Sequence, residues 1–184
     1  IQFNKASQNV TAGIRHTSMT FGPDGKLYTT TIDGRIIRYN VASDGTLSSP
    51  YTINTITTKE GGRRSAMAIV FDPSSTANNL IAYVSHSDFA GLELKEYEAE
   101  ALGAASNWTG KITKLGGANL QTAQDIVTGL PRSVRDHQNY QMAFGADGKL
   151  YVSQSSMSAM GRPDNAWGNQ AEVPVSYTHL RAHE

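Results

Sequence analysis

The sequence contains no cysteine and no excess of charge of either sign. Without cysteine the chain cannot form a disulfide, a cysteine-ligated zinc or iron–sulfur site, or a thiol nucleophile. Lys plus Arg and Asp plus Glu both number 16, so the formal net charge is zero. No basic field exists to attract nucleic acid or an anionic membrane surface, and we expect neither as a partner.

Long apolar runs are also missing. No segment approaches the ~20 consecutive apolar residues that a membrane-spanning helix needs, so we predict no membrane span. The sequence begins at Ile1 and not at a methionine, so a signal peptide, if the natural chain has one, would precede it.

Two ten-residue segments are nearly identical. Residues 19–28 (MTFGPDGKLY) and 142–151 (MAFGADGKLY) agree at eight of ten positions, and a degraded copy runs from Met67 to Val84. Each copy predicts a strand, a tight turn and a second strand, because Asp can bond its own backbone and Gly accepts a positive φ. The alternation after the first turn, over residues 27–30, predicts a half-buried strand.

The residues between the copies complete four-stranded units. Residues 35–39 and the β-rich run 51–58 predict the third and fourth strands of a propeller blade. A second blade is predicted over residues 66–128, with outer strands near 110–114 and 121–128.

Two further features follow from this division. Residues 88–107 interrupt the second blade as an insertion, in which 93–102 predict a short helix, and a third blade of two strands begins at Gln141. The predicted fold class is therefore all-β, a β-propeller fragment of about two and a half four-stranded blades. Such an open ring leaves apolar faces and sheet edges exposed.

The last residues do not continue any of these patterns. Residues 175–184 (VSYTHLRAHE) are similar to the translation of a transposase sequencing adapter. We therefore divide the chain into a partial propeller, residues 1–173, and a non-native tail, residues 174–184, and exclude His179 and His183 from any site.

One loop combines residues suited to chemistry. Leu130-Pro131 and then Asp136-His137-Gln138 lie between the second and third blades, just before the strand at Gln141. Loops that lead into the innermost strands of a propeller lie near its central channel, and functional residues concentrate on such loops.

The order Leu-Pro, Asp136-His137-Gln138 and a Phe-Gly-x-Asp-Gly-Lys-Leu-Tyr-Val strand pair resembles the soluble quinoprotein (PQQ-dependent) glucose/sorbosone dehydrogenase family. The resemblance covers residues 10–173, about the first half of a six-bladed propeller. Residues 107–112 and 158–169 look like a bacterial branch whose members are often parts of larger exported proteins. The resemblance implies an oxidoreductase acting on a sugar or related alcohol, with pyrroloquinoline quinone (PQQ) as cofactor and calcium held by later blades. It also implies a periplasmic, secreted or cell-surface location and fusion to other extracellular domains.

By this resemblance His137 is the general base and Asp136 orients its ring. Imidazole suits proton transfer because its ordinary pKa of about 6.5 lies near operating pH. A carboxylate beside it stabilises its charged form. The alternative is that His137 only caps or packs a loop.

Arg63 and Arg64 occupy the corresponding approach to the second blade, where the quinone-binding family tends to carry a glutamine. Arginine grips carboxylates in bidentate fashion, and the quinone has three, so these residues are the candidate cofactor ligands. The alternative is that both are solvated surface charges.

Other assignments stay open. His86, at the end of a predicted inner strand, either faces the channel or lies near solvent, and His16 is most simply a loop residue. The rival functions are a non-catalytic propeller module that binds carbohydrate or protein, and a lactonase-like calcium hydrolase. The hydrolase would need a set of carboxylate and Asn ligands that the sequence does not clearly offer.

Overall fold

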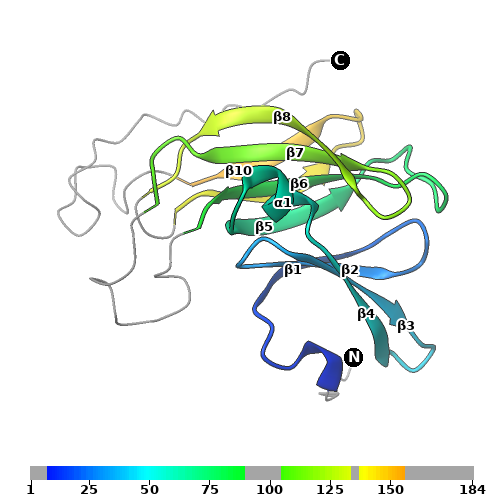
Figure 1. Cartoon of the computed structure of the whole chain (residues 1–184). Helices are drawn as coiled ribbons and strands as arrows, with labels where there is room; N and C mark the ends of the chain where they lie inside the picture. Colours follow the sequence, from blue (N-terminus) through cyan, green and yellow to red (C-terminus); the bar gives the residue numbers. More distant parts are fainter. Residues whose placement is uncertain (1–7, 90–104, 134–136, 156–184) are drawn as a thin grey trace, which may run out of the picture.

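The computed structural model describes residues 8–89, 105–133 and 137–155. Its strands form antiparallel sheets, each wound as a meander in chain order (Figure 1). Blade one contains β1 (His16–Phe21), β2 (Leu27–Thr31), β3 (Ile36–Val41) and β4 (Leu47–Ile53). Blade two contains β5 (Arg64–Phe71), β6 (Ile81–Asp88), β7 (Gly110–Gly116) and β8 (Thr122–Leu130). In blade three β9 (Asn139–Phe144) pairs with β10 (Leu150–Gln154).

The first strands of the sheets lie next to one another. β1 contacts β5, and β5 contacts β9, as expected of the innermost strands around a propeller channel. A short 3-10 helix, η1 (Asn9–Thr11), precedes β1 and contacts β4. The all-β propeller fragment predicted from the sequence is confirmed.

The hydrophobic core lies between the blades, because each sheet buries its faces against its neighbours. Blades one and two share a cluster that includes Tyr28, Ile36, Ile69, Val84 and Leu115. Blades two and three share Ala68, Ile112, Leu130, Met142 and Leu150. Ile69 and Ala68 are neighbours on β5 that enter different clusters, which is the alternation of a strand covered on both sides.

Strand β2 departs from the half-buried alternation predicted for it. Tyr28, Thr29, Thr30 and Thr31 are all buried. Both faces of the strand are covered, and its threonines bond within the fold: Thr29 Oγ1 donates to the Ile37 carbonyl at 3.2 Å. The predicted half-buried strand is therefore wrong for β2, because residues on both of its faces are buried.

The segment after β4 is a helix, so the predicted strand over residues 51–58 is wrong at its C-terminal end. Helix α1 (Thr55–Glu60) ends at Gly61, whose φ is 71°. The Gly62 N–H donates to the Thr57 carbonyl at 3.0 Å, a glycine-based helix stop. Ile56 is fully buried, so packing outweighs the strand preference of β-branched residues. No described helix is long and apolar enough to cross a membrane.

The repeated turns have one geometry. In blade one, Gly25 has φ 72°, and the Tyr28 hydroxyl donates to Asp24 at 2.9 Å. A Cβ on Gly22 would lie 2.7 Å from the Tyr28 ring, so glycine is required there. In blade three, the Tyr151 hydroxyl donates to Asp147 at 3.1 Å.

The degraded copy makes the same tyrosine–aspartate contact, but its aspartate stands at a different position of the turn. The Tyr83 hydroxyl donates to Asp72 at 3.1 Å, and Asp72 stands where the other copies have glycine. We call this side of the molecule, with its Tyr–Asp pairs 28–24, 83–72 and 151–147, the hairpin end.

Candidate functional site

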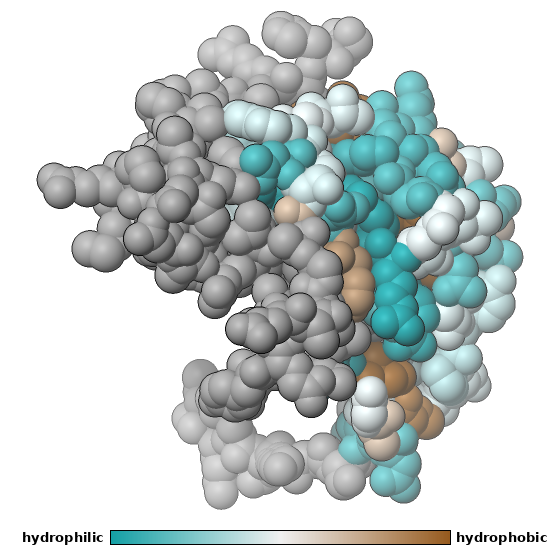
Figure 2. All heavy atoms as spheres, turned by 60° about the vertical axis from the view of Figure 1, so that its left-hand side comes forward, coloured by the Kyte–Doolittle hydropathy of each residue, from teal (hydrophilic) through white to brown (hydrophobic). Residues whose placement is uncertain are grey.

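The opposite end of the blades carries the sequence-predicted site. It is defined by strand termini at His16, Thr31, Arg64, Asp88, Gly110, Leu130 and Asn139, and we call it the loop end. Figure 1 shows it on the left, with the hairpin turns on the right. Figure 2 turns this side forward and shows a strip of hydrophilic residues beside the part drawn in grey.

Strand register makes positions at the loop end equivalent between blades. Phe21, Phe71 and Phe144 each pair with the first or second residue of the next strand. Five residues before each phenylalanine stand His16, Ala66 and Asn139. Their partners across the sheet are Thr31, His86 and Gln154. Seven residues before the phenylalanine, Arg64 occupies in blade two the position of His137 in blade three.

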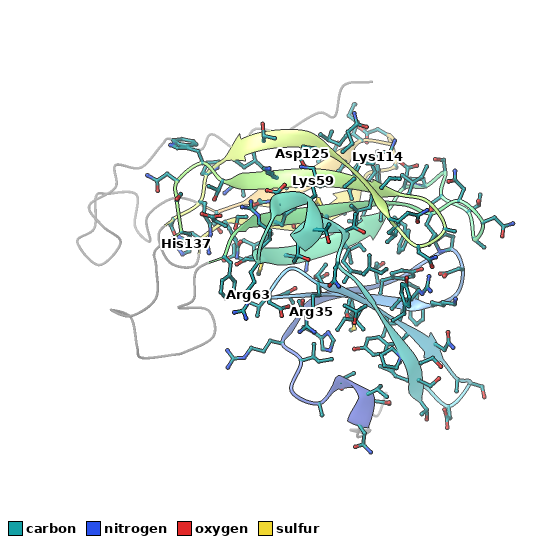
Figure 3. All side chains as sticks on the ribbon, viewed as in Figure 1. Arg35, Lys59, Arg63, Lys114, Asp125 and His137 are labelled. Atoms are coloured by element: carbon teal, nitrogen blue, oxygen red, sulfur yellow. The ribbon has the colours of Figure 1, made fainter. Side chains whose placement is uncertain are left out.

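His137 is half-buried and lies two residues before β9. Its backbone is held on both sides: the Ser133 N–H donates to the His137 carbonyl at 2.8 Å, and the His137 N–H donates to Ser133 Oγ at 2.9 Å. Next to it, the buried Gln138 side chain accepts a hydrogen bond from Ser87 Oγ. His137 therefore lies at the loop end with its backbone held by Ser133 (Figure 3). Asp136 lies outside the described residues.

Arg63 and Arg64 have different environments: Arg63 precedes β5, and Arg64 is its first residue. Arg63 is exposed, and its guanidinium carbon lies 5.6 Å from the centre of the Phe89 ring. Arg64 is only 6% exposed, so the alternative of a solvated surface charge is wrong for this residue. Its side chain donates to Asp88 Oδ1 at 2.9 Å and to the Thr109 carbonyl at 2.6 Å.

His86 is fully buried, so neither of its predicted settings, the channel face or a solvent-exposed strand end, is correct. Arg64 Nε donates to His86 Nδ1 at 3.1 Å, which leaves the ring proton on Nε2. Nε2 therefore donates to Thr113 Oγ1 at 2.8 Å, and Thr113 donates to Asp125 Oδ1 at 2.7 Å. Burial and the Arg64 charge lower the pKa of His86 to about 3, so the ring is neutral.

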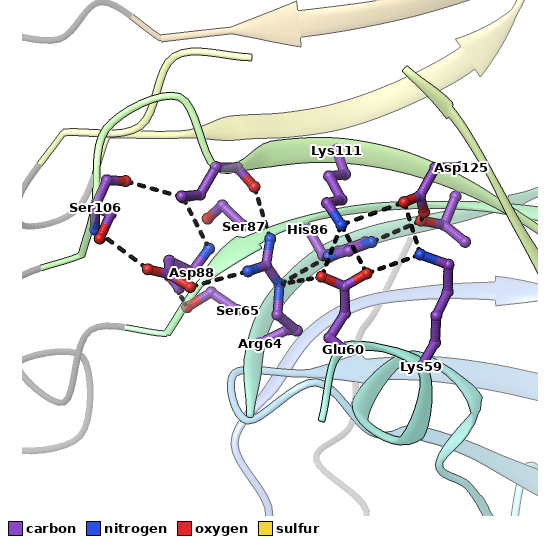
Figure 4. Close-up of polar contacts among 12 residues, drawn as sticks. Lys59, Glu60, Arg64, Ser65, His86, Ser87, Asp88, Ser106, Lys111 and Asp125 are labelled. Atoms are coloured by element: carbon purple, nitrogen blue, oxygen red, sulfur yellow. Dashed lines mark hydrogen bonds and ion pairs between the residues drawn. The ribbon is translucent and has the colours of Figure 1, made fainter. Parts of the chain in front are cut away.

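A layer of paired charges covers this histidine between α1 and the face of blade two (Figure 4). Lys111 Nζ lies 2.8 Å from both Glu60 oxygens and 3.2 Å from Asp125 Oδ2. Lys59 Nζ lies 2.6 Å from the same Asp125 oxygen. Burial disfavours ionisation of Asp125, but hydrogen bonds from Lys59, Thr113 and Lys111 outweigh it and lower its pKa to about 2. Burial likewise opposes ionisation of Glu60, but hydrogen bonds from Lys111 and Lys59 outweigh it and lower the pKa of that carboxyl.

Glu60, His86 and Asp125 have the ligand types and the spacing of a metal site, with donor atoms within 4.8 Å of one another. Their present partners argue against that use. The ammonium groups of Lys111 and Lys59 already neutralise both carboxylates, and both His86 nitrogens are hydrogen-bonded. A divalent cation would have to displace two lysines, so this cluster serves as an internal ion-pair layer.

Two blades meet closely at this end. Gly34, in the turn between β2 and β3, has φ 91°, and a Cβ there would lie 2.7 Å from the Arg64 carbonyl oxygen. The adjacent Arg35 pairs with Asp33 at 2.9 Å. His16 is exposed, but it is the first residue of β1 and pairs with Thr31, so its predicted place in a loop is wrong. The centre of its ring lies 6.1 Å from that of the Tyr39 ring.

Several residues of this part of the molecule have no signal in the sequence. Lys111 and Asp125 lie on the consecutive strands β7 and β8, but no local pattern places Glu60 of α1 against them. Arg132 lies in the loop between blades two and three and is fully buried. A buried arginine in a loop has no sequence signature of its own.

Comparison with known proteins agrees with the fold. Residues 18–39 match the family described as strictosidine synthase-like, N-terminal. These residues include most of β1, all of β2 and most of β3. No curated protein sequence matches the chain significantly.

A solved structure from Thermus thermophilus, described as an oxidoreductase (glucose dehydrogenase), is similar at TM-score 0.50 and 18% sequence identity. The match covers 78% of this chain and 38% of that one, so the chain spans well under half of the larger protein. At this identity the likeness shows the fold alone: the chain is an all-β propeller fragment with the strand arrangement of that structure.

Proposed function

We propose that the complete protein is an oxidoreductase that removes hydride from a sugar or a related alcohol, with His137 as the general base. The observation that supports this most is the placement of His137. It is half-buried at the entrance to an innermost strand, with its backbone held by Ser133. The shared fold with an oxidoreductase described as a glucose dehydrogenase supports the same reading.

In this mechanism His137 takes the proton of the hydroxyl group on the carbon that is oxidised. A neutral imidazole accepts it as the hydride leaves that carbon. Asp136, next to it in sequence, would stabilise the resulting imidazolium. PQQ, when bound, supplies the acceptor for the hydride, and calcium would be held by parts of the protein beyond these blades.

The described residues fit the quinone only partly. Arg63 is exposed at the loop end and can offer two donors to a carboxylate. Each of the three Arg64 nitrogens already donates to His86, Asp88 or the Thr109 carbonyl. Arg64 would have to give up these contacts to bind a cofactor, so Arg63 is the better ligand of the two.

The rival function is a non-catalytic propeller that binds carbohydrate or protein in a larger exported protein. The charged layer of blade two favours it, because Lys59, Glu60, Lys111 and Asp125 are paired with one another and not directed to a ligand. The same fold can carry either function, so an activity measurement is needed to distinguish them.

The test uses the complete gene, recovered beyond residue 173. The predicted non-native tail, residues 174–184, lies outside the described residues, so this sequencing also tests its origin. A natural gene that encodes residues 174–184 unchanged would contradict the prediction that the tail is non-native.

The product is loaded with PQQ and calcium, and sugar-dependent dye reduction is followed for the natural protein, His137→Ala and His16→Ala. His16 is the exposed histidine at the loop end of blade one and serves as the matched control. Loss of about 100-fold or more in kcat for His137→Ala alone supports the base. Equal loss of kcat in both variants contradicts the role of His137 as the base. If no sugar of a panel is oxidised and no quinone binds, the non-catalytic binding module is the supported function.

The cofactor ligand is tested separately by quinone titration. Arg63→Ala should weaken binding about tenfold or more, because a charged hydrogen bond to a carboxylate is lost. Arg38→Ala, an arginine that stacks on Tyr51 in blade one, is the control. Unchanged affinity in Arg63→Ala would remove Arg63 from the cofactor site.

A further inference from the structure

The loop that carries His137 is held in place by contacts that begin at Arg64. The Arg64 guanidinium joins the start of β5 to the end of β6 through Asp88 and to the residue before β7 through the Thr109 carbonyl. Its third nitrogen is fixed by His86. Arg64 is only 6% exposed, and these three partners fix the orientation of its guanidinium.

Asp88 is the junction of the next contacts (Figure 4). Its second carboxylate oxygen accepts the Ser106 N–H at 3.2 Å, and its own N–H donates to Thr109 Oγ1 at 3.2 Å. Its backbone carbonyl accepts both Arg132 Nε at 3.3 Å and Arg132 Nη2 at 3.2 Å. Arg64 thus positions, through Asp88, the carbonyl group on which Arg132 rests.

Arg132 leads directly to His137. It is fully buried, and the residue after it, Ser133, makes the two hydrogen bonds that close the loop onto the His137 backbone. The Ser87–Gln138 contact ties the other side of His137 to the same end of β6. A continuous set of contacts therefore runs from the start of β5 to the histidine.

We propose that Arg64 and Arg132 are positioning residues for His137, acting through Asp88 at the end of β6. Neither needs to touch substrate. Because a displacement of about 1 Å in a reacting group can cost about 100-fold in rate, a loop held at both ends by buried side chains matters for turnover more than for substrate binding. The effect on turnover rests on the proposed role of His137, whereas the effect on its position does not.

The test compares Arg132→Lys and Arg64→Lys with Arg38→Lys in the complete protein. Lysine keeps the charge but loses the planar fork of donors. Two readouts are needed: kcat and KM for the sugar, and the ring signals of His137 in histidine-labelled protein, assigned with His137→Gln. We expect kcat to fall about 10- to 100-fold with KM within about twofold, and the His137 signals to shift. Arg38→Lys should change neither.

Ser133→Ala serves where an arginine variant does not fold, because it removes only the hydroxyl that accepts the His137 N–H. It should shift the His137 signals in a protein that still melts cooperatively. Unchanged His137 signals in all folded variants would overturn the inference. If the natural protein oxidises no sugar but the signals still shift, the proposed function fails and the positioning of His137 stands.

Discussion

The two ends of the blades differ in how much of their side-chain chemistry is shared from blade to blade. At the hairpin end, every described blade uses a tyrosine that donates to an aspartate in the preceding turn, even where the aspartate has moved to Asp72. At the loop end, the equivalent positions hold His16, Ala66 and Asn139, which have no chemistry in common. In blades one and three, a backbone turn with a positive φ and a ring packed on glycine admits few sequences, whereas a loop end must only close the next blade. Variation within one chain therefore separates the end that builds the fold from the end that is free to carry a function.

The largest effect should come from the glycine at which blades one and two meet. Gly34→Ala forces a side chain against the Arg64 carbonyl at a φ of 91° and should cost about 3 kcal/mol of unfolding free energy. Gly25→Ala, in the hairpin turn, has open space around the added carbon and only an unfavourable φ of 72°, so about 1 kcal/mol is expected. Urea unfolding of the complete protein measures both. Equal costs would show that the contact between the blades does not constrain position 34.

The second effect is a pH dependence that arises at the loop end. The folded pKa of His86, about 3, lies below its unfolded value of 6.5, so between these values the unfolded state binds the extra proton. Stability therefore falls as pH decreases below 6.5, by about 2 kcal/mol between pH 6.5 and 5. His86→Gln should flatten this part of the curve of unfolding free energy against pH. An unchanged slope in the variant would mean that other groups titrate there.

The third effect compares an aspartate of the charged layer on blade two with one at the hairpin end. Asp125 has a folded pKa of about 2 against an ordinary 3.8, so its contribution is present above pH 3.8 and is lost as pH falls towards 2. Asp125→Asn should cost about 2 kcal/mol at pH 7. Asp147→Asn, at the exposed hairpin of blade three, should cost less, because solvent screens its contact with Lys149. Thermal melts at pH 7 and pH 3 test this, and a larger loss for Asp147→Asn would reverse the comparison.

The smallest effect lies within the hairpin end itself. Tyr28→Phe removes a hydrogen bond from a fully buried ring and leaves Asp24 without it, so we expect a loss of about 1 kcal/mol. Tyr151→Phe removes the same bond from a ring that is 38% exposed, where water can replace it, and should cost less than about 0.5 kcal/mol. Denaturant midpoints of the two variants give the difference directly. Equal midpoints would mean that burial does not matter for this contact.

Predictions from the sequence succeeded where short-range chemistry decides the outcome. The Asp-Gly turns, the strands on either side of them and the division into blades need only neighbours in the chain, and they are all present. The strand predicted over residues 51–58 failed from Thr55 onward, because Ile56 reaches a core formed by distant strands. Arg63 and Arg64 carry the same side chain one residue apart, yet one is exposed and the other is buried.

The repeat alone was thus enough to determine that this chain is a propeller fragment, and where its blades begin. It also placed His137 before an inner strand, since that depends on distance along the chain. Only the tertiary structure decided that His86 is a buried neutral ring, that Lys111 lies between Glu60 and Asp125, and that Arg132 supports the loop of His137. Those contacts join strands and loops that are far apart in the chain, as in the pairing of Lys59 with Asp125, which are separated by 66 residues. Charge and burial at such sites depend on which blade faces which, and no local pattern contains that information.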